Sequence, residues 1–212
     1  MTCSKVLNGA QTVLVVVALE DWRVELITYQ SAKPFVERWH HSRKVNGLHI
    51  SQCFGLFRSR PDFFGIPEMI GVAMYGKPAM NSQGQKWCPS DPSKLVELRR
   101  LCCIDGVSKD AKSFFVSETI KWMKKTTDFE VAVAYVDPEH EHTGLTYIAS
   151  NWKLMGLTSA GVVLVVDGVC YHDRTLRVDK PYARKIKSRS EQPDGGVTIQ
   201  PTAPKYIFLY RL

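Results

Sequence analysis

A strand-length segment, a polar turn and an amphipathic helix follow one another along the chain, and this unit constrains the fold most. Leu95–Ile104 is mainly apolar and predicts a strand with charges in its middle, and the polar residues of Asp105–Lys112 predict a turn. A helix over Ser113–Lys125 is indicated by apolar residues at helical spacing, which are Val116, Ile120 and Met123. A strand that leads straight into such a helix is typical of a mixed α/β sheet.

The other apolar segments are short, and they place the expected elements in the order β–α–β–β–β–α–β–α–β–β. Further strands are expected at Arg23–Tyr29, Leu48–Phe57, Glu68–Tyr75, Glu130–Val136, Val162–Val166 and Tyr206–Tyr210. Further helices are expected over Ser31–His40, capped by Ser31, and over Thr143–Met155, ended by Gly156. The second of these would bury Leu145, Ile148, Trp152 and Met155. This order predicts an α/β fold with a mixed, largely antiparallel sheet flanked by helices.

Length and composition favour one globular domain over residues 1–212. The chain has 212 residues, of which 44% are hydrophobic and 23% charged, which excludes collagen-like and wholly disordered classes. Residues 1–22 are expected to be an N-terminal extension. Its apolar run Val13–Leu19 predicts a buried strand, because it is too short to span a bilayer and no signal-peptide cleavage site follows. Residues 76–91 are expected to form a loop, and residues 180–203 a basic Pro/Gly-rich loop or flap.

The cysteines argue against a zinc site and against a disulfide framework. There are six, without any C-x-x-C spacing, and Cys102 and Cys103 are adjacent inside an apolar stretch. The pattern is typical of reduced, mostly buried thiols in a cytosolic protein.

The charge balance points to an anionic partner. The chain carries 28 Lys+Arg against 21 Asp+Glu, a formal net charge of +7. A short stretch gathers Lys180, Arg184, Lys185, Lys187 and Arg189, with Tyr182 among them. This arrangement resembles a strip that contacts nucleic-acid phosphates and stacks one base, although a solvated charged loop would have the same composition. Lys121, Lys124 and Lys125 add further positive charge that would also face DNA phosphates.

A phosphate site is expected where the Leu95–Ile104 strand leads into the following helix. The first turn of a helix presents free N–H groups and the positive end of the helix dipole. Arg100, Lys109 and Lys112 lie close to that end in the sequence and would add positive charge. Neither a Walker A motif nor G-x-G-x-x-G is present, so the segment is not a nucleoside-triphosphate or Rossmann signature. The alternative is an ordinary capped helix with solvated lysines.

Histidines and carboxylates form two further candidate clusters. His40 and His41 follow Trp39 at an expected helix end, where they could bind a metal or supply a base, or simply interact with the helix dipole. Asp137 directly follows a buried strand, which is a common place for catalytic residues in open α/β sheets. The cluster continues through residues 139–142, and its alternative is an acidic turn that caps the next helix.

Tyr147 and Asn151 are spaced i, i+4 on the expected helix over Thr143–Met155, beside its apolar face. Together they would make a polar patch close to Asp137. Such a patch could orient a substrate base or a thioester carbonyl, or it could make only surface hydrogen bonds.

Taken in order, several motifs resemble those of the Mom family of phage DNA-modification proteins. The resemblance spans roughly residues 23–160 and rests on Trp39-His40-His41-Ser42, Gly71-Val72-Ala73-Met74-Tyr75-Gly76, Glu97-Leu98-Arg99-Arg100-Leu101-Cys102, Ser113-Phe114-Phe115-Val116-Ser117, Tyr135-Val136-Asp137 and Thr146-Tyr147-Ile148-Ala149-Ser150-Asn151-Trp152. That family looks like a branch of the GNAT acyltransferases. The resemblance therefore implies a GNAT-like domain in which acyl-CoA lies where two central strands splay apart.

The resemblance implies a reaction and a set of residues for it. The reaction adds an acetamido (carbamoylmethyl) group to N6 of adenine in DNA, which protects phage DNA from restriction nucleases in the host cytoplasm. Acetyl-CoA is the implied cofactor, with its pyrophosphate on the helix after the Leu95 strand. Its candidate ligands are Arg100, Leu101, Lys112 and Ser113. The candidate groups around the substrate are Asp137, Tyr147, Tyr75 and Asn151, and the DNA backbone would lie on Lys185, Lys187 and Arg189.

The acetamido product needs chemistry beyond acetyl transfer, and the resemblance implies bound Fe(II) as its source. The implied ligands would be His40, which is also a catalytic candidate, together with His41 or a nearby carboxylate. The family usually has His-Tyr where this chain has His40-His41. Two other functions compete with DNA modification. One is a conventional GNAT N-acetyltransferase that acts on a protein or a small-molecule amine. The other is a non-catalytic DNA-binding anti-restriction protein.

Overall fold

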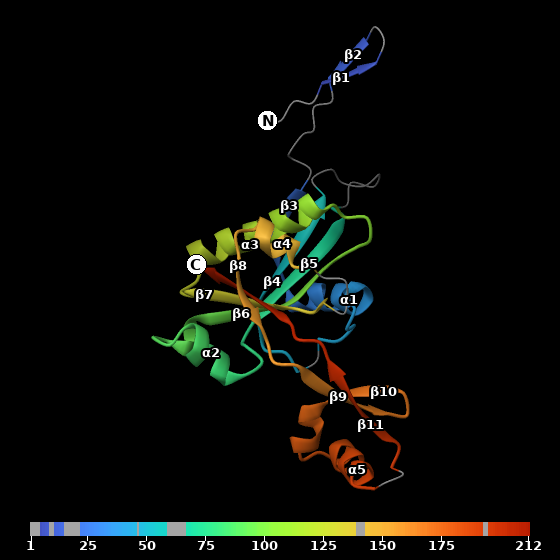
Figure 1. Ribbon diagram of the computed structural model, residues 1–212. Helices are drawn as coiled ribbons and strands as arrows, with labels where there is room; N and C mark the ends of the chain where they lie inside the picture. Colours follow the sequence, from blue (N-terminus) through green and yellow to red (C-terminus); the bar gives the residue numbers. More distant parts are fainter. Residues whose placement is uncertain are drawn as a thin grey trace.

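The computed structural model describes residues 5–8, 11–14, 22–45, 47–58, 67–138, 143–192 and 195–212. A seven-stranded sheet forms its centre, in the order β3-β4-β5-β6-β7-β12-β8 (Figure 1). Its strands are β3 (Trp22–Ile27), β4 (Ile50–Arg58), β5 (Met69–Gly76), β6 (Leu95–Cys103), β7 (Val131–Val136), β12 (Tyr206–Arg211) and β8 (Lys153–Leu157). Neighbouring strands are antiparallel except for β6 and β7, which run parallel. The predicted fold class, a mixed and largely antiparallel sheet flanked by helices, is confirmed.

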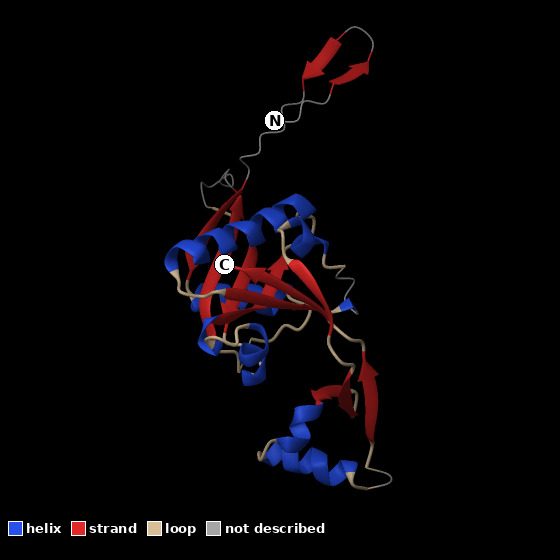
Figure 2. Ribbon diagram, turned by 60° about the vertical axis from the view of Figure 1, so that its left-hand side comes forward, coloured by secondary structure: helices blue, strands red, loops and turns tan. Residues whose placement is uncertain are grey.

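Helices cover both faces of this sheet (Figures 1 and 2). On one face α3 (Lys109–Thr126) buries its apolar stripe against the strands, beside the short α4 (Leu145–Ala149). On the other face α1 (Tyr29–Trp39) buries Ala32, Phe35 and Val36. The same face carries α2 (Asn81–Trp87), whose Trp87 packs over β6, β7 and β12. Because both faces are covered, the central strands are apolar at nearly every position rather than alternating.

A second, smaller sheet carries the basic segment and lies at one end of the molecule (Figure 1). It consists of β10 (Val169–His172), β9 (Gly161–Val166) and β11 (Val197–Thr202), with η3 (Asp173–Arg177) and α5 (Pro181–Ser190) beside it. Residues 180–203 therefore contain a helix and a strand, and the predicted loop is wrong. The reason is packing: Ala183 and Ile186, three residues apart on α5, are buried, and Ile186 contacts Leu164 and Val166 of β9.

Two predictions in the N-terminal half, one for a helix and one for a loop, need correction. The N-cap of α1 is Thr28, whose hydroxyl accepts a hydrogen bond from the Ser31 backbone N–H at 3.1 Å, so Ser31 lies inside the helix. Residues 76–91, predicted to be a loop, contain α2. Gly84 lets this polar helix pack closely on the short helix η1 (Pro92–Lys94), because a Cβ at Gly84 would lie only 2.8 Å from atoms of Pro92. That packing is not visible in the local sequence.

The predicted helix over Thr143–Met155 is also wrong. Only α4 is helical. It ends before Asn151, which has a left-handed φ of 62°, and Lys153–Leu157 forms the edge strand β8. Pairing of β8 with β12 decides this conformation, since Tyr206 is the register partner of Leu157 and Leu209 that of Lys153. Of the expected inner face only Trp152 is buried, while Leu145, Ile148 and Met155 are exposed.

Several predictions fall partly on residues outside the described ranges. In the N-terminal extension β1 (Lys5–Asn8) and β2 (Gln11–Leu14) form an antiparallel pair, so the expected Val13–Leu19 strand begins within β2 and its remainder, residues 15–19, is not described. The acidic cluster at 139–142 lies wholly outside as well. No helix in the described part of the chain has the length and apolarity that a bilayer crossing requires.

Gly144 is a position where we expect a methyl group to be costly. Its φ is +75°, and an added Cβ would lie 2.5 Å from the ring of Phe208, which is buried and stacks on Tyr147. Gly144→Ala should lower the free energy of unfolding by roughly 2–4 kcal/mol, because backbone strain and overpacking add. Urea denaturation measures this. Gly106→Ala is the matched control, since Gly106 has φ +78° but open space around it. Equal losses in the two variants would contradict the packing argument.

Candidate active site

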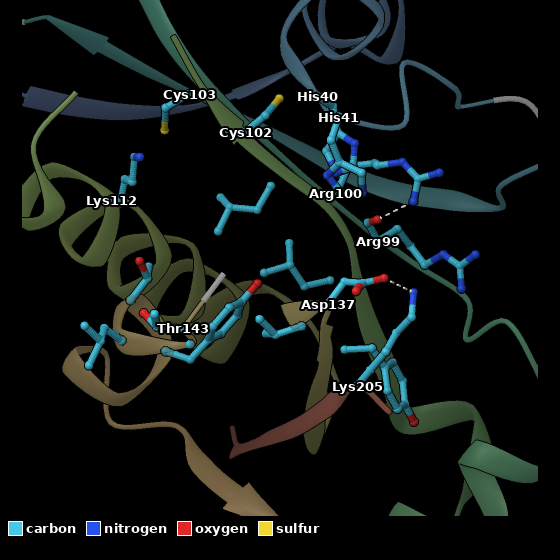
Figure 3. A pocket seen from close by; sticks show the side chains of 18 of the residues that line it. His40, His41, Arg99, Arg100, Cys102, Cys103, Lys112, Asp137, Thr143 and Lys205 are labelled. Atoms are coloured by element: carbon cyan, nitrogen blue, oxygen red, sulfur yellow. Dashed lines mark hydrogen bonds and ion pairs between the residues drawn. The ribbon is translucent and has the colours of Figure 1, made fainter. Parts of the chain in front are cut away.

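A cavity of about 1260 Å³ opens where β6 and β7 separate (Figure 3). The two strands pair only from Leu95 and Val131 to Leu98 and Ala134, whereas β6 continues to Cys103. Beyond Leu98 the β7 side of β6 faces this cavity. Residues from β6, from the end of β7, from the start of α3 and from α1, α2 and α4 line it.

A bulge in β6 shapes the wall of the cavity. Met74 of β5 is the partner of Arg100, but Tyr75 is already the partner of Leu98, so Arg99 is the extra residue. Beyond the bulge Leu101 and Cys103 join Leu98 in the cluster packed under α3. Burial raises the pKa of Cys103 to about 11, so this thiol stays protonated at neutral pH and is not poised as a nucleophile.

The start of α3 supplies the cationic end of the cavity. Ser108 caps the helix by accepting a hydrogen bond from the Ala111 backbone N–H at 3.1 Å. Lys109 and Lys112 of the first turn line the cavity, and Figure 3 shows Lys112 beside Cys103 at one end of it. The helix begins at Lys109, four residues before the predicted start. Ser113 also lines the cavity, but its hydroxyl donates to the Asp110 carbonyl at 3.0 Å.

Arg100, predicted to bind the cofactor, is used within the fold. Its Nε and Nη2 donate to the Lys44 carbonyl at 3.0 and 2.8 Å, and its Nη1 donates to the Arg99 carbonyl at 2.7 Å. The guanidinium thus ties the segment after α1 to β6. Burial lowers the pKa of Arg100, without removing its charge at neutral pH. All four predicted cofactor ligands, Arg100, Leu101, Lys112 and Ser113, therefore line the cavity. The nitrogens of the Arg100 guanidinium donate at the same time to backbone carbonyl groups of the fold.

Asp137 and Tyr147, two of the candidate active-site residues, both line the cavity. Asp137 follows the last residue of β7, its side chain is only 17% exposed, and its Oδ2 lies 2.8 Å from Lys205 Nζ. Tyr147 is held by ring contacts, stacked on Phe208 and edge-on to Trp152. Burial raises the pKa of Tyr147 well above its ordinary value, so its hydroxyl remains a proton donor at neutral pH.

Tyr75 and Asn151 do not belong to this group. Tyr75 is completely buried in the central strand β5, where its hydroxyl is hydrogen-bonded to the Thr119 hydroxyl at 2.7 Å. It lines no described part of the cavity and is a core residue, because α3 covers that face of the sheet. Asn151 is exposed and follows α4 in a left-handed conformation, so the expected i, i+4 patch with Tyr147 does not form.

His40 and His41 line the cavity near the end of α1, but their geometry does not fit a shared metal ion. Their ring centroids are 4.1 Å apart and the ring planes are tilted by 36° to each other. Moreover, the Ser42 backbone N–H donates to His40 Nδ1 at 3.1 Å, which places the proton of a neutral ring on Nε2. Within the described residues no group of three His, Cys, Asp or Glu side chains is arranged for a metal. The implied Fe(II) is not supported.

Of the basic residues predicted to contact DNA, Lys185, Lys187 and Arg189 lie on α5, whereas Lys121, Lys124 and Lys125 lie on α3. Lys185 and Lys187 are exposed. Arg189 instead makes two hydrogen bonds to Asp167, at 2.6 and 2.9 Å, and donates to the Gly195 carbonyl at 2.8 Å. Arg189 therefore fixes the β9–β10 turn and the segment before β11 to the helix, and the exposed charge of α5 comes from its lysines and Arg184.

Several residues that line the cavity are not predicted from the sequence. Lys205 lies in the connection between β11 and β12, where no motif marks it. Glu97 and Arg99 form a buried ion pair at 2.8 Å on the cavity wall, with side chains 10% and 13% exposed. Their charges inside a predicted strand are a usable signal, because charges inside a central strand are rarely tolerated without a partner. Gln83 of α2 lies in a segment that resembles a loop.

Comparison with known proteins agrees with this architecture. The model of the Mom protein family matches residues 21–211. No curated protein sequence matches the chain. Among solved structures, AAC(6')-Ib in complex with paromomycin and acetyl-CoA aligns with a TM-score of 0.50 and 10% identity, over 90% of this chain and 93% of that one. NAA60 of Arabidopsis thaliana with acetyl-CoA aligns with a TM-score of 0.47 and 16% identity, over 90% and 98%. The fold is that of the GNAT acetyltransferases.

Proposed function

Because the chain belongs to the Mom protein family, we propose that it is an acyl-CoA-dependent transferase that modifies N6 of adenine in DNA. The added group is acetamido (carbamoylmethyl), and the modified DNA escapes restriction nucleases of the host cell, in whose cytoplasm the enzyme acts. One observation carries the proposal: a single cavity joins the cationic first turn of α3 to the Asp137 carboxylate at the end of β7.

The residues at the α3 end fit acetyl-CoA. The first turn of α3 offers backbone N–H groups and the dipole, and Lys109 and Lys112 add charge, as a pyrophosphate requires. The stretch of β6 beyond Leu98, not paired with β7, offers backbone groups to the amides of the pantetheine arm. The length of the cavity leads from there toward Asp137 (Figure 3). Attack of the amine on the thioester carbonyl of bound acetyl-CoA would join an acetyl group to nitrogen and release CoA. An acetamido product would in addition need a nitrogen donor and a two-electron oxidant as co-reactants.

The residues at the β7 end of the cavity fit a substrate whose amine receives the transferred group. The Asp137 carboxylate can accept a proton or orient the exocyclic amine, and Lys205 holds it in place at 2.8 Å. The Tyr147 hydroxyl, kept protonated by burial, can donate to the thioester carbonyl or to an intermediate. The target adenine must leave the duplex to reach this depth, so base flipping or a single-stranded substrate is required.

Nucleoside mass spectrometry tests the proposal. DNA from cells that express the protein should contain deoxyadenosine with the added mass of an acetamido group, and DNA from cells without it should not. If the nucleosides remain unmodified although the protein is soluble and binds acetyl-CoA, the proposed DNA chemistry fails. Acetylation of a protein or small amine in its place would identify a conventional N-acetyltransferase. Salt-dependent DNA binding without acetyl-CoA binding would identify a non-catalytic DNA-binding protein.

A further inference from the structure

The wall of the cavity that α2 forms carries an oriented amide. Trp87 Nε1–H donates to Gln83 Oε1 at 3.1 Å, and the Tyr135 hydroxyl donates to the same oxygen. The indole N–H can only donate, and it lies closer to this Gln83 atom than to the Tyr135 hydroxyl oxygen, at 3.1 against 3.4 Å, so the Gln83 atom is assigned as the amide oxygen. Both lone pairs of that oxygen are used. Within the described residues no hydrogen bond engages the Gln83 Nε2 amide, and Gln83 lines the cavity.

The neighbouring wall is a fixed charged pair. Glu97 Oε2 accepts from Arg99 Nη1 at 2.8 Å and from the Ala79 backbone N–H at 2.9 Å. Arg99 Nε is buried without a hydrogen-bond partner among the described residues, which is uncommon for a donor in a folded protein. Figure 3 shows Arg99 at the same end of the cavity as Asp137 and Lys205, away from Lys112. This end of the cavity therefore combines the Gln83 and Arg99 hydrogen-bond donors with the half-buried Tyr135 ring and the Asp137 carboxylate.

We propose that Gln83 and Tyr135 form the subsite that receives the adenine ring, an inference that rests on the proposed function. The Gln83 Nε2–H₂ group donates to a ring nitrogen next to the reactive amine, either N1 or N7, while Tyr135 provides apolar surface for the ring. Since Gln83 Oε1 is already saturated, the amide accepts nothing from N6. The exocyclic amine stays free on the Asp137 side, two residues beyond Tyr135 on the chain.

Gln83→Glu tests the subsite because it keeps the oxygen that Trp87 and Tyr135 use and replaces only the donor group. Adenine modification in cells should fall about tenfold or more, measured by nucleoside mass spectrometry, with unchanged thermal unfolding and acetyl-CoA affinity. Gln85→Glu makes the same charge change at an exposed position of α2 and is the matched control. If Gln83→Glu modifies DNA as well as Gln85→Glu does, the subsite is overturned.

A binding measurement keeps the test independent of the reaction. The probe is a duplex oligonucleotide with one target deoxyadenosine opposite an abasic site, or the same duplex with 1-deaza- or 7-deaza-deoxyadenosine. The analogue that lacks the nitrogen contacted by Gln83 should bind the wild-type protein about fivefold or more weakly than the deoxyadenosine probe does. Its binding to Gln83→Glu should equal that of the deoxyadenosine probe. Insensitivity of the wild-type protein to both analogues overturns the subsite. Unmodified DNA from cells that make the wild-type protein, together with analogue-sensitive binding, overturns the proposed chemistry and retains the subsite.

Discussion

Asp137→Asn should reduce adenine modification by about a hundredfold or more. The substitution preserves the size of the side chain and its place at the end of β7, but it removes the negative charge that accepts a proton or orients the amine. Losses of about 10²–10⁴-fold are typical when a positioned acid–base group is removed. The measurement is the fraction of modified deoxyadenosine in DNA from expressing cells, at matched protein levels.

A variant of Lys205, which pairs with Asp137, distinguishes the effect of the Asp137 charge from the effect of its exact position. Lys205→Met removes the ion pair but leaves the carboxylate in the cavity, so it should cost much less activity than Asp137→Asn. Both variants should bind acetyl-CoA as the wild-type protein does, because Lys112 in the first turn of α3 lies at the other end of the cavity (Figure 3). Modification by Asp137→Asn close to the wild-type level would contradict a role in the reaction.

The double substitution Lys185→Ala/Lys187→Ala should weaken DNA binding about 60-fold at about 0.1 M salt. Each phosphate contact contributes about 0.9 to the slope of log K against log salt, so two lost contacts lower the slope by about 1.8. Both side chains are exposed on α5, whose apolar side is buried, so the fold of the small sheet should be retained. Fluorescence anisotropy over a salt series measures the affinity and the slope.

Lys121→Ala/Lys125→Ala removes the same charge from α3, whose lysines the sequence also predicts to face DNA, and it serves as the comparison variant. Both pairs of lysines are exposed, but α3 covers the central sheet, whereas α5 belongs to the small sheet at one end of the molecule (Figure 1). The small sheet adjoins the Asp137–Lys205 end of the cavity through the β11–β12 connection. We therefore expect DNA to bind along α5, and we expect the α3 variant to change DNA affinity little. An equal decrease in slope for both variants would contradict this assignment.

Local pattern predicts those elements whose stability depends on their own residues. The strand that ends at Cys103 is predicted to within one residue, because its apolar run and the following polar turn are contiguous in the sequence. The segment Lys153–Leu157 resembles the end of a helix, and the prediction fails there because its partner strand β12 lies far along the chain.

The candidate site shows the same division. Asp137 and Lys112 can be found from the sequence because a strand end and a helix start are recognisable locally. Tyr75 is misplaced because nothing near it reveals that its side of β5 is covered by α3. Gln83 escapes because only tertiary packing makes its segment a helix and turns it to the cavity.

Short-range periodicity and ordered motifs are enough to specify the fold class, the family resemblance and the strand–turn–helix unit that holds the cationic end of the cavity. They do not specify which charges are available. Long-range packing sets that: Arg100 and Arg189 bind carbonyl and carboxylate groups of the fold, while Lys205, just before β12, reaches Asp137 at the end of β7. The physical reason is that a charged side chain takes whichever partner lies within hydrogen-bond distance, and residues remote in the sequence determine that distance.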